Sequence, residues 1–209
     1  MKLEAIILAA GAGSRFGGGK LLAPWGDGVL LDGAMATAFA APVDLVSVVW
    51  GGDRRVVSAA RTFADRAGQS GRLRLVHAEH HADGMAQSLK TGVAAVDPAA
   101  AGAFVFLGDM PRIAPSIPTR LAEALAGGAM AAAPSFASRR GHPVLFAAAL
   151  FPQLSALSGD RGAAQVLAGL GEALALVASP DDGVLFDVDR PDDLNVQTSQ
   201  RWSSPPTRD

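Results

Sequence analysis

The stretch I-I-L-A-A-G-A-G-S-R-F-G-G-G-K, from Ile6 to Lys20, decides the fold. It continues a largely apolar run that begins at Leu3, and it then places five glycines within nine residues. A continuous apolar run predicts a buried strand of a parallel sheet, because such strands are covered on both faces. Glycines directly after a strand allow a sharp turn and a close approach of backbone to a ligand. The stretch therefore predicts a strand that delivers a ligand-binding loop.

The glycine-rich loop also carries two cations, Arg15 and Lys20. Free backbone N–H groups of such a loop form a concave site for an anion. A guanidinium and an ammonium on the same loop add charge that neutralises the anion. The phosphate chain of a nucleotide fits these properties. The alternative is a loop that only makes a tight turn and leaves both cations in solvent.

The spacing of the loop excludes two common phosphate motifs. A Walker A loop, G-x-x-x-x-G-K-[ST], would need glycine at Ser14 and a hydroxyl residue at Leu21. A dinucleotide fingerprint, G-x-G-x-x-G, would need its third glycine at Phe16. The pattern present is L-A-A-G-x-G-x-R-F-G-x-x-K. It resembles the loop of GT-A-like, Rossmann-related nucleotidyltransferases, and above all that of the MobA-like molybdenum cofactor cytidylyl- and guanylyltransferases.

Length and composition set further bounds. The 209 residues are 49% hydrophobic, which suits one α/β domain with a full core. The formal net charge of -2 gives no basic excess for a nucleic-acid partner. Without cysteine, neither disulfides nor thiolate metal sites can form, which fits a cytoplasmic protein. No apolar run approaches the roughly 18 residues of a membrane helix, so no membrane partner is expected.

The rest of the chain alternates strands and helices, which predicts a single three-layer α/β domain with a mainly parallel, Rossmann-like sheet. From residue 134 the alternation changes, and this half is expected to leave the sheet and return to it. The domain is predicted to span residues 1–196, and the polar, proline-rich residues 197–209 to form a flexible tail. Strands are expected at 3–10, 45–50, 73–77, 104–107, 130–133, 144–146, 174–177 and 184–188. Helices are expected at 30–40, 54–67, 83–96, 116–126, 147–154, 161–170 and 191–200.

The segment L-G-D-M-P, with Asp109 at its centre, follows the predicted strand 104–107. In open α/β sheets, ligands bind beyond the carboxyl ends of the strands. A carboxylate there, beside a triphosphate, is expected to hold Mg²⁺ together with phosphate oxygens. The segment also resembles the metal motif of the family. The alternative is that Asp109 caps the turn at Pro111.

The segment F-D-V-D-R-P-D-D-L, from Phe186 to Leu194, resembles a second acidic stretch of the family. The resemblance implies that Asp189 completes the metal site. Asp187 is the other candidate, because strand alternation would place both carboxylates on the same side. Asp192 and Asp193 are expected to cap the final helix, whose N-terminus favours negative charge.

The segment G-M-A-Q-S-L resembles the part of the family in which glycine and serine lie against the nucleotide base. An ordinary helix N-terminus is the alternative for this segment. Three histidines, His77, His80 and His81, fit no ordered metal triad and are expected in solvent. The resemblance therefore assigns nucleotide binding to Leu8, Ala9, Ala10, Gly11, Gly13, Gly84 and Ser88.

Two loops in the second half resemble those that contact the second substrate of the family. They carry His142 and Asp160. His142 would bind an acceptor phosphate or fill a turn, and Asp160 would contact the acceptor or cap its helix. Arg139 and Arg140 would attract an anionic acceptor or remain solvated.

The resemblance implies nucleotidyl transfer. The phosphate of molybdopterin would attack the α-phosphorus of a nucleoside triphosphate, and pyrophosphate would leave. A phosphate monoester has its second pKa near about 6, so no general base is required. Catalysis would rest on Arg15, Lys20 and Asp109, with Mg²⁺ or Mn²⁺ on Asp109 and Asp189. A molybdoenzyme or its chaperone is a possible partner for the product.

Ala10 favours CTP as the nucleotide. Cytidylyltransferases of the family tend to carry L-A-A-G, and guanylyltransferases L-A-G-G. A methyl group at this bend narrows the slot for the base, which suits a pyrimidine. Three alternatives stay open: GTP as donor, a sugar or isoprenoid phosphate as acceptor, and a non-catalytic carrier of the cofactor. An NAD(P)-dependent oxidoreductase is disfavoured by Phe16.

Overall fold

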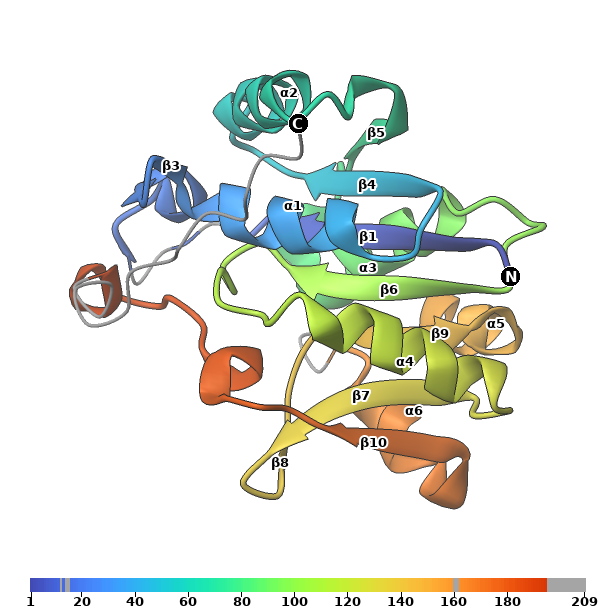
Figure 1. The fold of residues 1–209 in the computed structure, drawn as a ribbon. Helices are drawn as coiled ribbons and strands as arrows, with labels where there is room; N and C mark the ends of the chain where they lie inside the picture. The colour runs from blue at the N-terminus through green and yellow to red at the C-terminus, as the bar shows by residue number, and fades with distance from the viewer. Residues whose placement is uncertain (12, 14–15, 160–161, 195–209) are drawn as a thin grey trace.

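The computed structural model describes residues 1–11, 13, 16–159 and 162–194. Its main sheet has the strand order β10-β7-β9-β6-β1-β4-β5, with β8 paired to β7 (Figure 1). The central strand β1 is the one predicted from the glycine-rich stretch. The strands are β1 (Leu3–Ala9), β4 (Leu45–Trp50), β5 (Leu73–His77), β6 (Gly102–Leu107), β7 (Ala131–Phe136), β8 (Arg139–Arg140), β9 (Val144–Ala147) and β10 (Leu174–Ala178).

The sheet is parallel around β1 and mixed at one side. β1 pairs in parallel with β4 and with β6, so that Leu8 lies opposite both Val49 and Leu107. β9 is inserted between β6 and β7 and is antiparallel to both. The predicted mainly parallel sheet is confirmed, and the change of rhythm after residue 134 corresponds to this antiparallel insertion.

Helices cover both faces of the sheet and make the three layers predicted from the alternation. One face carries α1 (Leu30–Ala40), α2 (Arg55–Arg66) and α4 (Ser116–Ala126), and the other carries α3 (Met85–Ala94), α5 (Phe151–Ser155) and α6 (Ala164–Ala168). Figure 1 shows α1 and α4 in front of the sheet and α3 behind it. Along β1, Ile7 packs toward α1, whereas Ile6 packs toward α3. Both side chains are fully buried, which explains why the strand is apolar without alternation.

Strands β1, β4 and β6 end at the same edge of the sheet, on the left in Figure 1. We call this the carboxyl edge, and the opposite one the amino edge. A short 3₁₀ helix (Lys20–Leu22) and a hairpin of β2 (Pro24–Trp25) and β3 (Gly28–Val29) follow the glycine-rich loop there. The chain after β10 returns to the same edge. Segments far apart in the sequence thus meet where ligands bind in sheets of this kind.

The expected strand at residues 184–188 is wrong. The chain there forms a 3₁₀ helix (Asp182–Leu185) and then crosses the carboxyl edge outside the sheet. Val184 and Val188 are buried, which mimics a strand pattern. Their backbone instead bonds to loops: the His142 N–H donates to the Val184 carbonyl, and the Val188 N–H donates to the Asp109 carbonyl.

Other expectations differ mainly in their boundaries. The expected helix 147–154 begins one residue later as a 3₁₀ turn (Ala148–Leu150) that leads into α5, and the expected helix 161–170 is reduced to α6. Of the last expected helix, only residues 191–194 are described, as a 3₁₀ turn. The expected tail lies outside the described residues. Among the described residues, no helix is long and apolar enough to cross a membrane.

Candidate active site

The glycine-rich loop turns back on itself at Gly13. The Gly13 carbonyl accepts hydrogen bonds from Phe16 N–H at 2.9 Å and from Gly18 N–H at 3.1 Å. Gly13 has a φ of 57°, and the three glycines at 17–19 also have positive φ, where side chains are disfavoured. The loop conformation therefore depends on its glycines. Arg15 lies outside the described residues, so its proposed contact with phosphate stays a prediction.

Lys20 reaches from the end of this loop to two carboxylates. Its Nζ lies 2.6 Å from Asp109 Oδ2 and 3.4 Å from Asp189 Oδ1. Burial alone would lower the pKa of Lys20, but the hydrogen bond and charge of Asp109 and the charge of Asp189 outweigh it and raise the pKa. Lys20 therefore stays charged, and it joins three segments that are distant in the sequence.

Asp109 is held in place by backbone hydrogen bonds on both sides. It follows β6, and the Gly108 N–H donates to the Leu8 carbonyl of β1 at 3.0 Å. The Val188 N–H donates to the Asp109 carbonyl at 3.1 Å, and the Met110 side chain is buried below. The carboxylate is thus presented at the carboxyl edge, beside the glycine-rich loop.

Asp189 is positioned by a cap formed by Asp193. Asp193 Oδ2 accepts hydrogen bonds from the N–H groups of Asp189 at 2.9 Å and Arg190 at 2.7 Å. These bonds lower the pKa of Asp193, first through Arg190 and then through Asp189. Asp193 thus caps the tight turn that follows Asp189, whereas the helix that Asp192 and Asp193 were expected to cap lies mostly outside the described residues.

Asp187 lies close to the same cluster, and the charges of Asp189, Asp109 and Lys20 all act on its carboxyl group. Partial burial, followed by the charges of Asp189 and Asp109, raises the pKa of Asp187. Of the two carboxylates that the sequence left as alternatives, Asp189 is the one that shares the ammonium with Asp109. Asp187 adds negative charge at its side.

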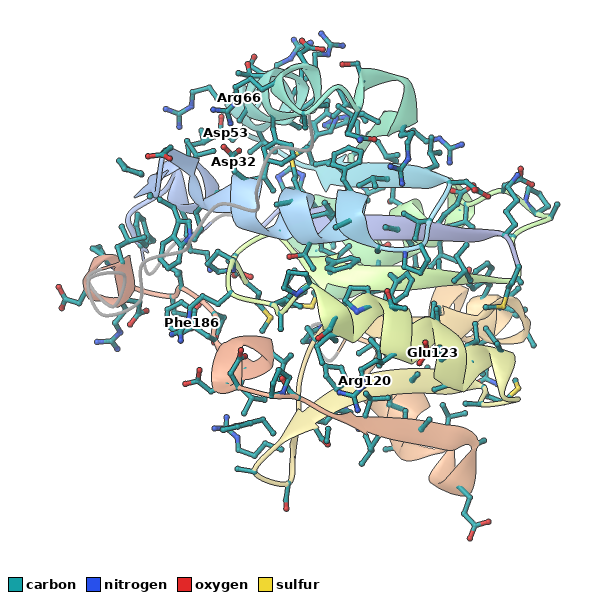
Figure 2. The ribbon with its side chains drawn as sticks, in the orientation of Figure 1. Asp32, Asp53, Arg66, Arg120, Glu123 and Phe186 are labelled. Carbon is teal, nitrogen blue, oxygen red and sulfur yellow. The ribbon has the colours of Figure 1, made fainter. Side chains whose placement is uncertain are left out.

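An aromatic brace, defined as Trp25, Phe186 and Arg112, holds the acidic segment against the β2–β3 hairpin. The rings of Trp25 and Phe186 lie 6.2 Å apart, and the Arg112 guanidinium lies 4.6 Å from the Phe186 ring centre. Arg112 also pairs with Asp182 at 3.3 Å. Figure 2 shows Phe186 on the side of the molecule where this segment crosses. Sequence reasoning missed the brace, because no local pattern links residues so far apart in the chain.

Of the residues assigned to the nucleotide, Ala10, Gly84 and Ser88 lie on the α3 side of the sheet, whereas Ala9 packs on the opposite face of β1. Ala10 is buried in the same cluster as Leu89 of α3. Gly84 is the N-cap of α3, with a φ of 111°, and Ser88 is buried one turn further along. The end of β1 and the start of α3 therefore lie close together, and both were assigned to the nucleotide base.

The residues expected to contact the second substrate differ in their burial, and one of them is not described by the structure. His142 is half-buried, and the loss of solvent around its ring lowers the pKa of the ring, so the ring is neutral near pH 7. Its Nδ1 is a buried atom without a hydrogen-bond partner among the described residues. Arg139 and Arg140 are exposed in β8. Asp160 lies outside the described residues.

The three other histidines do not form a metal site. His77 is exposed and stacks on Trp50 at 4.1 Å, and the His80 side chain is 78% exposed. The expectation of a solvated side chain is wrong for His81, which is half-buried and bonds through Nδ1 to the Ala78 carbonyl at 3.0 Å. Within the described part of the chain, no group of three or more histidine, aspartate or glutamate side chains could hold a metal.

Asp109 and Asp189 nevertheless fit a hard divalent cation. Their carboxylates already converge on one cationic group, the Lys20 ammonium. Carboxylate oxygens suit Mg²⁺ or Mn²⁺, and Mg²⁺ characteristically takes one or two protein carboxylates and completes its shell with phosphate and water. The donor set therefore fits a metal that is bound jointly with a triphosphate.

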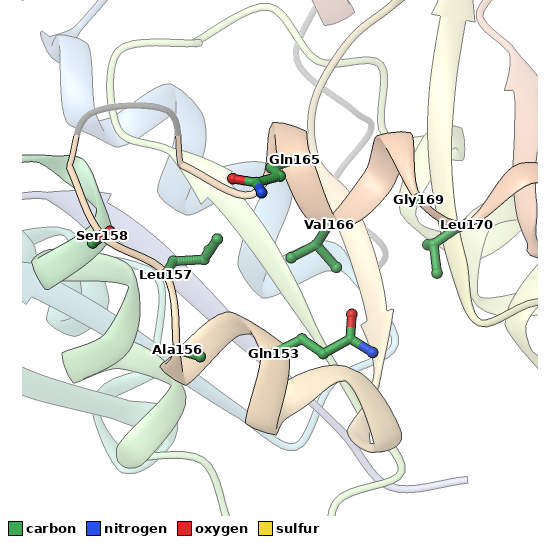
Figure 3. A pocket seen from close by; sticks show the side chains of 8 residues that line it. All are labelled: Gln153, Ala156, Leu157, Ser158, Gln165, Val166, Gly169 and Leu170. Atoms are coloured by element: carbon green, nitrogen blue, oxygen red, sulfur yellow. The ribbon is translucent and has the colours of Figure 1, made fainter.

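A separate groove of about 530 Å³ lies between α5 and α6. Figure 3 shows Gln153 and Leu157 on one side and Gln165 and Leu170 on the other. Among the described residues, no charged side chain lines it, and no member of the Lys20 cluster does. It does not have the chemistry of a phosphate site.

A glycine-rich loop, a lysine and two aspartates thus lie together at the carboxyl edge of this α/β sheet. Residues 5–175 match the MobA-like NTP transferase domain, and the chain belongs to that family. It is a nucleotidyltransferase.

Known relatives agree with this assignment over nearly the whole chain. The molybdenum cofactor cytidylyltransferase of Escherichia coli (strain K12) is 26% identical over 203 residues, which cover 96% of this chain and 97% of that protein. The crystal structure of Rv0371c from Mycobacterium tuberculosis H37Rv has a TM-score of 0.78 and 26% identity, covering 96% of this chain and 100% of that one. A complex of Rv0371c with manganese has a TM-score of 0.73 at 26% identity, covering 94% and 97% of the two chains.

Proposed function

We propose that the chain transfers the cytidylyl group of CTP to the phosphate of molybdopterin and releases pyrophosphate. The observation that carries this proposal is the Lys20 ammonium, held between Asp109 and Asp189 beside the glycine-rich loop. It brings a phosphate-binding cation and two metal-binding carboxylates to one place. The similarity to the cytidylyltransferase of Escherichia coli supports the choice of CTP and of the acceptor.

The chemistry requires positioning and charge neutralisation. An oxygen of the acceptor phosphate attacks the α-phosphorus, and the bond from that phosphorus to the bridging oxygen of the β-phosphate breaks. A phosphate monoester is already largely ionised near neutral pH, so no protein base has to remove a proton. Arg15 and Lys20 hold the phosphates in line and neutralise the charge on the departing pyrophosphate.

Asp109 and Asp189 are the residues that would hold Mg²⁺, or Mn²⁺ as in the related complex of Rv0371c. When bound, the metal supplies positive charge to the phosphate oxygens. Lys20 stays charged in this acidic surrounding, because the two carboxylates raise its pKa. The lysine can therefore turn to the phosphates while the carboxylates turn to the metal.

The remaining assignments complete the proposal. Leu8, Ala9, Ala10, Gly11 and Gly13 border the nucleotide from the end of β1, and Gly84 and Ser88 border it from α3. His142 and Asp160 serve the acceptor; because His142 is neutral, its contribution is a hydrogen bond and not a charge. The product passes to a molybdoenzyme or its chaperone.

The direct test is pyrophosphate release with CTP, GTP, ATP and UTP at equal concentration, with Mg²⁺, with and without molybdopterin. We expect CTP to give the fastest release, and only with the acceptor present. Thermal stabilisation by each nucleotide provides a second ranking, because a ligand that binds the native state raises its stability. If GTP ranks above CTP in both assays, the chain is a guanylyltransferase.

Ala10→Gly tests the role of the methyl group in base selection. We expect the variant to keep its preference for CTP but to lower the CTP-to-GTP ratio of kcat/KM by about tenfold, within the range of about 1–3 kcal/mol for a methyl-scale fit. Ala5→Gly is the control, because Ala5 also lies in β1 but packs on the opposite face and is not among the residues assigned to the nucleotide. An unchanged ratio in Ala10→Gly would contradict the steric argument.

A further inference from the structure

His81 has a fixed orientation beside the region assigned to the base. It opens a short 3₁₀ helix (His81–Asp83) directly before α3. Its ring lies flat against the backbone at the end of β4: a Cβ on Gly51 would lie 2.6 Å from His81 Cγ and 2.9 Å from the Ala10 carbonyl oxygen. Gly51, the His81 ring and the Ala10 carbonyl therefore meet at one point, which leaves no room for a side chain at residue 51.

The hydrogen bond of His81 determines which ring nitrogen carries the proton. Nδ1 lies 3.0 Å from the Ala78 carbonyl oxygen, and a carbonyl oxygen can only accept. Nδ1 is therefore the donor, and in the neutral ring Nε2 is an acceptor. The Ala78 N–H in turn donates to the Trp50 carbonyl at 2.9 Å, so the segment that orients the ring is tied to β4.

The other ring nitrogen of His81, Nε2, has a lone pair that can accept a hydrogen bond. No hydrogen bond to it exists among the described residues, and it lies 3.2 Å from the place that a Cβ on Gly52 would take. A half-buried histidine with one nitrogen bonded and the other available is suited to read a hydrogen-bond donor on a ligand. The position of the ring, beside Ala10, makes the nucleotide base the ligand within reach.

We propose that His81 reads the 4-position of cytosine, with Nε2 accepting a hydrogen bond from the exocyclic amine. The proposal rests on the proposed CTP-dependent function and identifies a specificity-determining residue for it. Uracil presents a carbonyl oxygen at this position, and guanine presents one at its 6-position. Either oxygen would face the Nε2 lone pair, so His81 disfavours UTP and GTP. Adenine shares the amine, and its exclusion falls to the Ala10 methyl group.

The test is a thermodynamic cycle of binding affinities, measured by calorimetry with Mg²⁺. One side of the cycle is His81→Phe, which keeps a ring against Gly51 but has no acceptor. The other side is the pyrimidin-2-one analogue of CTP, which lacks only the 4-amino group. We expect each change alone to weaken binding by about tenfold, the upper range for one hydrogen bond, and both together to weaken it no further. His80→Phe is the control, because the His80 side chain is 78% exposed.

His81→Gln separates recognition from packing. Its side-chain amide can present either an oxygen or an N–H group, so CTP binding should be largely retained while UTP binding rises to approach it. A ring that serves only packing would weaken both nucleotides alike. If the wild type prefers CTP but discriminates CTP from the analogue no better than His81→Phe does, the role of His81 is overturned and the CTP assignment stands. If the wild type prefers GTP, the proposed function itself is overturned.

Discussion

Two ionic clusters lie at opposite edges of the same sheet and differ in how their charges are satisfied. At the amino edge, Lys2 pairs with Asp97 at 2.6 Å, and Arg74 pairs with Glu4 at 3.3 Å. The Asp97 N–H donates to Glu4 Oε1, which links the two pairs. At the carboxyl edge, two carboxylates share the one ammonium of Lys20.

The pKa values of the carboxyl groups shift in opposite directions at the two edges. The hydrogen bond from Lys2 lowers the pKa of Asp97, so the amino edge stabilises its carboxylate as an anion. Burial and the charges of Asp189 and Asp109 raise the pKa of Asp187, so the carboxyl edge crowds negative charges together. Matched pairs stabilise the fold, whereas carboxylates crowded at the carboxyl ends of strands are typical of a site for a cation and its ligand.

The largest effect is expected from Asp109→Asn. The amide has the size of the carboxylate but lacks its charge, so the fold should persist while the metal and triphosphate lose their anchor. We expect Mg²⁺-dependent pyrophosphate release to fall by about a thousandfold or more, in the range for loss of a principal electrostatic group. Release is measured over a Mg²⁺ titration, and circular dichroism confirms folding.

The matched control for this change is Asp97→Asn at the amino edge. That variant should be less stable at neutral pH, because it loses the ion pair with Lys2, but its turnover should equal that of the wild type. Near-normal turnover in a folded Asp109→Asn variant would remove the distinction between the edges and, with it, the metal assignment.

A smaller effect is expected from removing the lysine of each edge. Lys20→Ala should weaken CTP binding by about 10- to 150-fold, because a charge-assisted hydrogen bond is worth about 1.5–3 kcal/mol. Cytidine, which has no phosphate, should bind as before. Lys2→Ala should leave both ligands unaffected, and Arg15→Ala should behave like Lys20→Ala. Calorimetry with CTP and cytidine measures the three variants and the wild type. Equal CTP affinity in Lys20→Ala and the wild type would show that the loop only makes a turn and does not bind phosphate.

Part of this comparison could be predicted from the sequence alone. The glycine-rich loop, Lys20 and Asp109 all follow apolar strands. The carboxyl ends of parallel strands lie at the same edge of a sheet. Local composition was enough to place them together. The amino-edge pairs carry no such signal, because Lys2 and Asp97 come together only through the pairing of β1 with β6.

The choice between Asp187 and Asp189 needed the structure. Buried Val184 and Val188 indicated a strand, and strand alternation treated the two carboxylates alike. The segment instead crosses the Asp109 loop, where the Asp193 cap and the brace at Phe186 set which carboxylate meets Lys20. His81 was likewise missed, since its orientation depends on a contact with Gly51 that no local pattern shows.

The smallest expected effect is on the pH dependence of the free energy of unfolding, which should differ between the two edges. Burial lowers the pKa of His142 at the carboxyl edge below its ordinary value of 6.5. In the unfolded chain this ring takes up a proton as the pH falls below about 6.5, whereas the ring in the folded protein resists protonation. Its contribution to stability is therefore full above that pH and declines below it, with a slope of at most about 1.4 kcal/mol per pH unit for one proton.

The amino edge should respond at lower pH. The pKa of Asp97 is lowered from its model-compound value of 3.8, so its contribution is present above that value and is lost only as the pH falls below it. Urea unfolding between pH 7 and 3 should show two separate declines. His142→Phe should flatten the decline that begins below about pH 6.5 and leave the acidic one, while Asp97→Asn should do the reverse. His80→Phe serves as the exposed control. If the curves for His142→Phe and the wild type run parallel below about pH 6.5, His142 is not the group that links stability to pH at the carboxyl edge.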